Sequence, residues 1–156
     1  MLLKFTVNSQ TLIKHKSQDG VTVVSDSKNY LVAKFEFLSK DWTGKVAVAQ
    51  FTYDGKTYEQ VIGADKTLAI NECYIPNEVI YSPSFTVSCY AEGEERITTN
   101  EVCINVVKSG YKEEVVNRVT DNTSKQYQNA CQKYAMLCNE ILQDCQTIYK
   151  LMKEGK

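Results

Sequence analysis

Between Gly110 and Gly155 the chain contains neither glycine nor proline, the two residues that most often interrupt regular structure. Both prolines and five of the seven glycines come before residue 95. The stretch from Tyr111 to Glu154 is therefore free of turn signals, which is typical of one continuous helix and unlike a series of short strands. The sequence predicts two segments, with a boundary near Ser109-Gly110.

Apolar residues recur along this stretch in alternating steps of four and three, the heptad spacing of helices that pack on other helices. Cysteines and a methionine occupy one seam position, and tyrosines and isoleucines occupy the other. The predicted oligomerisation seam is Tyr127, Cys131, Tyr134, Cys138, Ile141, Cys145, Ile148 and Met152. Apolar residues also flank the seam, with Ala130, Leu137 and Leu151 on one side and Ala135, Leu142 and Tyr149 on the other.

So wide a stripe predicts a bundle of three or more helices, because a two-stranded coiled coil leaves the flanking positions in water and usually charges them. The segment Thr123–Gln126 has the form of a capping box and predicts the helix start. A helix over 123–153 is roughly 45 Å long at about 1.5 Å per residue. Val115, Val116 and Val119 lie upstream and out of heptad register.

The alternative is that the apolar face of the helix folds back onto the rest of the same chain. A rod of roughly 45 Å overhangs a domain of about 100 residues, whose radius of gyration is about 13 Å. We therefore favour self-association, or docking among the helices of a partner.

Residues 1–108 have the pattern of short strands separated by turns. In 30–37, 85–91 and 102–106, apolar side chains alternate at the period of two expected of strands with one buried face. Asp54-Gly55 is the pair favoured in a type I′ hairpin turn. The residues expected to point inward are Leu31, Ala33, Phe35, Phe37, Phe85, Val87, Cys89, Ala91, Val102, Ile104 and Val106.

Seven to nine strands in about a hundred residues predict a β-sandwich or a small barrel, and we favour an Ig-like or jelly-roll-like sandwich. Prolines flank residues 77–82, which predicts an edge strand or a loop there. The expected organisation is a sandwich domain over 1–108, a linker over 109–122 and an oligomerising helix over 123–153, either a coiled coil or part of a helical bundle.

The six cysteines do not have the arrangement of a disulfide framework. Cys73, Cys89 and Cys103 form an odd set in the strand region. The helix cysteines recur every seven residues, so their Cα atoms lie about 10 Å apart, farther than the 7 Å that a disulfide tolerates. We expect reduced thiols that serve as small apolar side chains, with a soft metal held between bundled helices as the alternative. The absence of C-x-x-C spacing disfavours structural zinc.

Composition excludes several classes of function. The net charge is −1, which gives no general attraction to nucleic acid or to an anionic membrane. The N-terminus lacks the apolar stretch of a signal peptide, and no apolar run is long enough to span a bilayer. We expect a soluble product of the cytoplasm, with no nucleic-acid partner, no membrane partner and no cofactor.

We also expect no catalytic and no metal site. His15 is the sole histidine, and its setting between two lysines is typical of a solvated residue rather than a catalytic base. Glu92, Glu94 and Glu95 could hold calcium weakly, but a solvated turn is the better interpretation. Trp42 could be an exposed contact for a ligand or partner, whereas core or turn packing is more common.

Several motifs in residues 1–110 resemble a β-sandwich domain of structural proteins from tailed phages and prophages of Gram-positive hosts. The domain is similar to the N-terminal domains of upper baseplate and fibre proteins. The motifs are Ser27–Leu31, Phe35–Phe37, Asp41-Trp42, the Asp54-Gly55 hairpin, Cys73–Ile80, Pro83–Tyr90 and Arg96–Asn100. The resemblance implies a non-enzymatic virion component, in which the helix sets the oligomeric state, usually a trimer, and the sandwich docks on other virion proteins. Head fibre, capsid decoration, tail and baseplate are all candidate locations.

Two other functions are kept as alternatives. The first is a carbohydrate- or host-receptor-binding module in which Trp42 and surface tyrosines stack on a ligand. Those tyrosines, Tyr30, Tyr53, Tyr58, Tyr74, Tyr81 and Tyr90, are equally normal as strand residues. The second is a small enzyme that uses His15.

Overall fold

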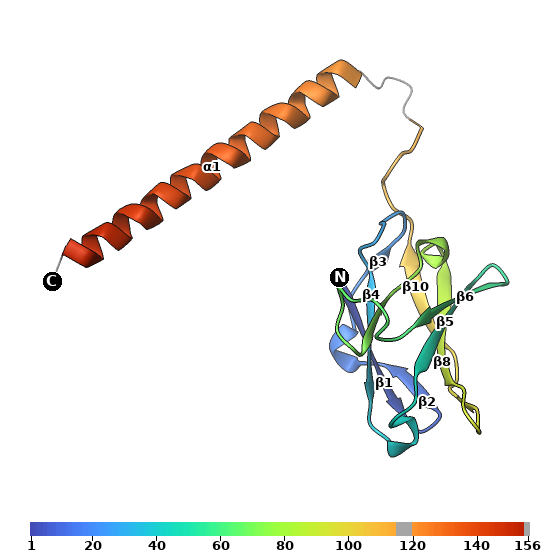
Figure 1. The fold of residues 1–156 in the computed structure, drawn as a ribbon. Coiled ribbons are helices and arrows are strands. Elements are labelled where there is room, and N and C mark those ends of the chain that lie inside the picture. The colour runs from blue at the N-terminus through green and yellow to red at the C-terminus, as the bar shows by residue number, and fades with distance from the viewer. Residues whose placement is uncertain (115–119, 155–156) are drawn as a thin grey trace. The chain divides into compact units, whose positions relative to one another are not determined.

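The computed structural model describes residues 1–114 and 120–154. The chain divides into two compact units, Met1–Tyr111 and Lys112–Lys156. The first unit has ten strands in two sheets among its described residues, and the second has one long helix (Figure 1). The prediction of a mainly β sandwich followed by a C-terminal helix is confirmed. The described residues form ten strands, whereas seven to nine were expected.

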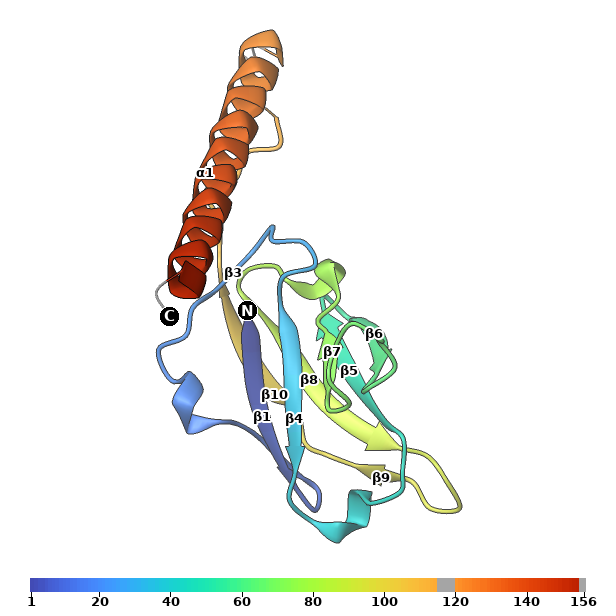
Figure 2. The ribbon, with the colours of Figure 1, turned by 60° about the vertical axis from the view of Figure 1, so that its left-hand side comes forward.

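One sheet has four strands in the order β2-β1-β4-β7, and the other has the order β3-β10-β8-β5-β6, with the short β9 paired to β8. The strands are β1 (Leu2–Asn8), β2 (Thr11–Lys14), β3 (Val23–Val24), β4 (Val32–Phe37), β5 (Ala47–Tyr53), β6 (Lys56–Val61), β7 (Glu72–Tyr74), β8 (Ser84–Ala91), β9 (Ile97–Thr98) and β10 (Val102–Val107). The pairs β1·β4 and β3·β10 are parallel, and the others are antiparallel. Figure 2 shows β1 and β4 running side by side.

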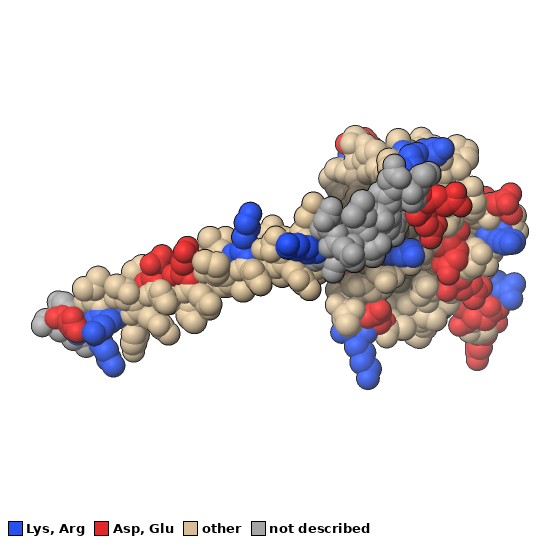
Figure 3. Space-filling model, turned by 90° about the horizontal axis from the view of Figure 1, so that it is seen from above, with Lys and Arg blue, Asp and Glu red and all other residues tan. Residues whose placement is uncertain are grey.

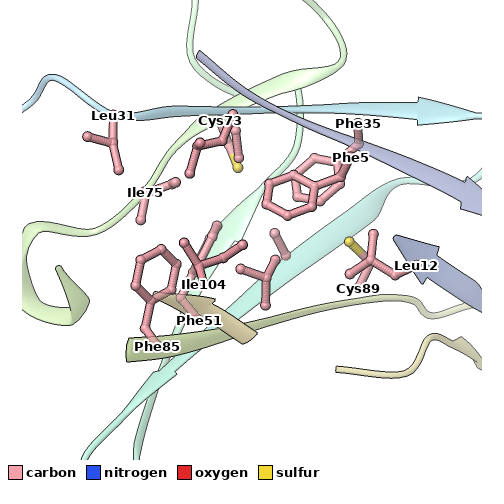
Figure 4. Packing of buried hydrophobic residues seen from close by; sticks show 14 of the residues in the cluster. Phe5, Leu12, Leu31, Phe35, Phe51, Cys73, Ile75, Phe85, Cys89 and Ile104 are labelled. Atoms are coloured by element: carbon pink, nitrogen blue, oxygen red, sulfur yellow. The ribbon is translucent and has the colours of Figure 1, made fainter. Parts of the chain in front are cut away.

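Aromatic and aliphatic side chains fill the space between the sheets (Figure 4). Phe5 and Phe35, on the adjacent strands β1 and β4, stack with ring centroids 5.3 Å apart. From the other sheet, Phe51 and Phe85 pack with centroids 6.4 Å apart. Of the residues predicted to point inward, Phe37 and Val102 are partly buried and the rest are buried. The period-two pattern therefore identified the core faces of β4, β8 and β10 correctly.

The turns follow local backbone chemistry. Asp54 and Gly55 have φ of 50° and 73°, the two positive values that a type I′ turn requires, and they join β5 to β6 as predicted. Residues 77–82 form no strand. They contain the short 3-10 helix η3 (Asn77–Val79), so the loop interpretation of the proline-flanked segment is the correct one. Two further 3-10 helices are η1 (Lys16–Gln18) and η2 (Lys40–Trp42).

The C-terminal helix α1 (Thr120–Glu154) has 35 residues, which corresponds to about 52 Å. Its described part already includes residues 120–122, which the prediction assigned to the linker over 109–122. Val115, Val116 and Val119 lie outside the described residues. In the described part of the chain, no helix is both long and apolar enough to cross a bilayer.

Candidate functional site

All eight residues of the predicted seam lie on α1 with exposed side chains. Ile141 is 56% exposed and Met152 is 73% exposed. The flanking leucines, Leu137, Leu142 and Leu151, are also more than half exposed. The stripe that the heptad pattern defined is therefore continuous along α1, and nothing within the described part of the helix unit covers it, over seven turns from Tyr127 to Met152 by the 3.6-residue repeat.

The opposite face of α1 is polar. The positions farthest from the seam carry Asn129, Gln132, Lys133, Asn139, Glu140, Gln143, Gln146, Thr147 and Lys150, with Met136 as an apolar exception. Asp144 is the one charged residue at a position next to the seam between residues 127 and 152. The helix thus has one broad apolar face and one solvated face, the pattern of a helix that packs among others.

The six cysteines lie in two kinds of environment. Cys73 and Cys89 are buried between the sheets (Figure 4), whereas Cys103 and the helix cysteines are exposed. Burial raises the pKa of the Cys73 thiol to about 12, and burial, together with nearby Cys73, raises the pKa of Cys89 further. These two thiols are small apolar core side chains with no tendency to ionise.

Trp42 does not have the exposed position that a ligand-stacking role requires. It is only 5% exposed, its ring packs on Phe37 with centroids 5.2 Å apart, and its indole Nε1–H donates to the Ser9 carbonyl at 2.8 Å. The candidate ligand contact at Trp42 is therefore wrong, and the interpretation as a packed core residue is correct. The physical reason is that a tryptophan in a turn can bury its ring when the indole N–H finds a backbone acceptor.

His15 lies at the N-terminus of η1 in a local capping arrangement. Its Nδ1 accepts from the Ser17 backbone N–H and lies 2.7 Å from Ser17 Oγ. A catalytic serine–histidine pair needs a third group that orients the ring, and among the described residues no carboxylate hydrogen-bonds to His15.

The acidic turn after β8 also lacks the geometry of a metal site. Glu92 pairs with Arg96 at 2.6 Å. Over residues 1–114 and 120–154 no group of three or more histidine, cysteine or acidic side chains is placed to hold a metal ion.

A polar network on the outer face of the six-stranded sheet was not found by sequence reasoning. Glu59 Oε1 accepts hydrogen bonds from the Tyr90 hydroxyl at 3.1 Å and from Gln50 Nε2 at 2.9 Å. The hydrogen bond to Glu59 is the main cause that raises the pKa of Tyr90. These side chains and the Arg96–Glu92 pair line a shallow depression of about 330 Å³.

The sequence carried only a weak signal for this depression. Tyr90 was one of several candidate surface tyrosines, and Glu59 is separated from it by 31 residues. Only the strand order β8-β5-β6 brings the two together.

No protein-family model matches this chain, and the curated proteins give no match to it.

Proposed function

We propose that this chain is a non-enzymatic structural protein of a phage particle that assembles through α1 into a homotrimer. The observation that supports assembly is the uncovered heptad stripe on a 35-residue helix. Burying a leucine or isoleucine side chain contributes about 1.5–3 kcal/mol, so leaving such a stripe in water forfeits a large stabilisation. A second copy of the chain supplies a matching stripe without any further partner.

The width of the stripe favours three helices over two. In a dimer, Leu137, Leu142 and Leu151 at the flanking positions would stay in water, whereas a three-helix bundle covers more of each flank. A closed trimer has threefold rotational symmetry, which requires the three helices to run parallel. Cysteine layers and tyrosine or isoleucine layers then alternate along the bundle axis.

The placement in a virion rests on the resemblance of residues 1–110 to sandwich domains of baseplate and fibre proteins. In this proposal the sandwich docks on other virion proteins, and trimerisation makes weak individual contacts act together. The protein needs no cofactor, nucleic acid or membrane for this role. The second candidate function is carbohydrate or receptor binding. Trp42 is buried and does not support it, but the depression beside Tyr90 does.

Multi-angle light scattering tests the assembly. We expect the full chain to have three times the mass of one chain, and a chain truncated after Ser109 to be monomeric. Ile141→Glu places a charge in the seam and should give a monomer, whereas Gln143→Glu places the same charge on the polar face and should leave the mass unchanged. A monomeric full chain, or a trimer that survives Ile141→Glu, would contradict the proposal.

A further inference from the structure

Tyr90, on the outer face of the six-stranded sheet, lines the depression. Its hydroxyl reaches Glu59 on β6, two strands away from β8, at 3.1 Å. Because neighbouring strands are about 4.8 Å apart, the side chains of Tyr90 and Glu59 must lean toward each other across β5. Tyr90 is partly buried, so part of its side chain is open to solvent.

The polar groups around this ring hydrogen-bond to one another. Gln50 and Tyr90 both donate to Glu59 Oε1, which fixes the carboxylate at one end. Arg96 donates from Nε and Nη2 to Glu92 Oε1 at 2.7 and 2.6 Å, in a pair whose side chains are both more than half exposed. Planar donors and acceptors thus surround Tyr90 and remain accessible to a ligand.

The depression combines an aromatic face with planar hydrogen-bonding groups in a concave space of about 330 Å³. That volume is at the small end of ligand sites, and a flat protein partner would not fill it. Its lining carries two carboxylates, Glu59 and Glu92, against the single guanidinium of Arg96, so anionic ligands are disfavoured. Figure 3 shows acidic side chains, with basic ones among them, on the side of the sandwich where Figure 1 places β5, β6 and β8.

We propose that this depression binds one residue of a neutral saccharide, with the apolar face of the sugar ring on Tyr90 and its hydroxyls on Glu59, Gln50 and Arg96. Pairs of hydroxyls on adjacent carbons match the two-pronged carboxylate, amide and guanidinium groups. The apolar C–H face of a pyranose matches an aromatic side chain such as Tyr90 that lines the depression. This binding function goes beyond assembly through α1 and uses none of the seam residues.

The test uses the full chain on an array of immobilised oligosaccharides that includes neutral, sialylated and phosphorylated members. We expect binding to neutral members, and Tyr90→Ala should weaken it at least about tenfold, which equals about 1.4 kcal/mol. Tyr90→Phe keeps the ring but loses its hydrogen bond to Glu59, so it should weaken binding less. Arg96→Ala, at a side chain that is 65% exposed and does not support the core, should also weaken binding.

The matched control is Tyr74→Ala, which removes a partly buried tyrosine from the outer face of the other sheet and should leave binding unchanged. Unchanged Trp42 fluorescence shows that each variant sandwich is folded, and unchanged mass shows that assembly is separate from binding. Absence of binding to every neutral glycan, binding confined to anionic glycans, or equal binding by wild type, Tyr90→Ala and Arg96→Ala would each overturn the proposal.

Discussion

At the scale of single residues, the cysteines show most directly how position decides chemistry. Cys73 and Cys89 lie in the core, and burial raises the pKa of both thiols. Cys103 lies on the outer face of β10 and is exposed. The three cysteines of α1 are exposed in one chain and would be covered in the trimer that we propose. Since the thiolate is the reactive form, exposure and pKa together set how fast each cysteine is alkylated.

The number of alkylated thiols per chain should therefore show which cysteines are covered in the assembled protein. After brief treatment with iodoacetamide at pH 8, we expect one modified thiol per chain in the assembled protein, Cys103, because the three seam thiols are covered and two are in the core. The monomeric Ile141→Glu variant should show four, and the denatured chain six. Intact-mass spectrometry gives the count, and Cys103→Ser should lower each count by one. Four modified thiols in the native wild type would mean that the seam is open.

Residue patterns predicted which side chains are buried better than they predicted which side chains contact one another. Alternation placed Phe35 and Cys89 in the core because strand geometry alone fixes their direction. For Trp42, composition left two interpretations open, and the hydrogen bond to Ser9, 33 residues away, decides between them. Tyr90 and Glu59 meet only through the strand order, which no local pattern contains. The candidate binding depression could therefore not be predicted from the sequence pattern.

At the scale of elements, the sequence predicted local structure correctly where a single backbone requirement determines it. The Asp54-Gly55 turn was predictable because a type I′ turn needs two positive φ values and few residue pairs tolerate them. The parallel pairing of β1 with β4 had no such signal, since the register depends on how the intervening loop crosses between strands. The capping-box pattern at Thr123 did not mark an end of α1, since residues 120–122 before it are also helical.

The hairpin turn gives a prediction about stability. Gly55→Ala forces a residue with a Cβ atom to keep φ near 73°, and we expect the free energy of unfolding to fall by about 1–2 kcal/mol. No atom lies within 4 Å of the position that the new Cβ would take, so the cost is one of backbone conformation alone. Urea denaturation followed by Trp42 fluorescence measures it. Gly110→Ala, where the space is equally open and φ is not positive, should change stability little.

At the scale of the whole molecule, the two units differ in how they are stabilised. The sandwich has its own core, with buried side chains from both sheets. Within the described part of the helix unit, nothing packs on the seam or the flanking leucines of α1. Helices without tertiary packing are marginal in water, because nucleation is costly and propensity alone contributes little. In the trimer that we propose, the helix gains its stability from the other copies, so only this unit should depend on protein concentration.

Dilution should therefore melt the helix while the sandwich stays folded. We expect ellipticity at 222 nm to fall over the same concentration range in which the mass drops from trimer to monomer. Trp42, buried in the sandwich against Phe37, should keep its fluorescence throughout. Gln143→Glu should follow the wild-type curve, since its charge lies on the polar face, whereas Ile141→Glu should show the diluted spectrum at every concentration. A helix signal that does not change while the mass falls would mean that α1 is stable alone and that packing in the seam is not what holds it.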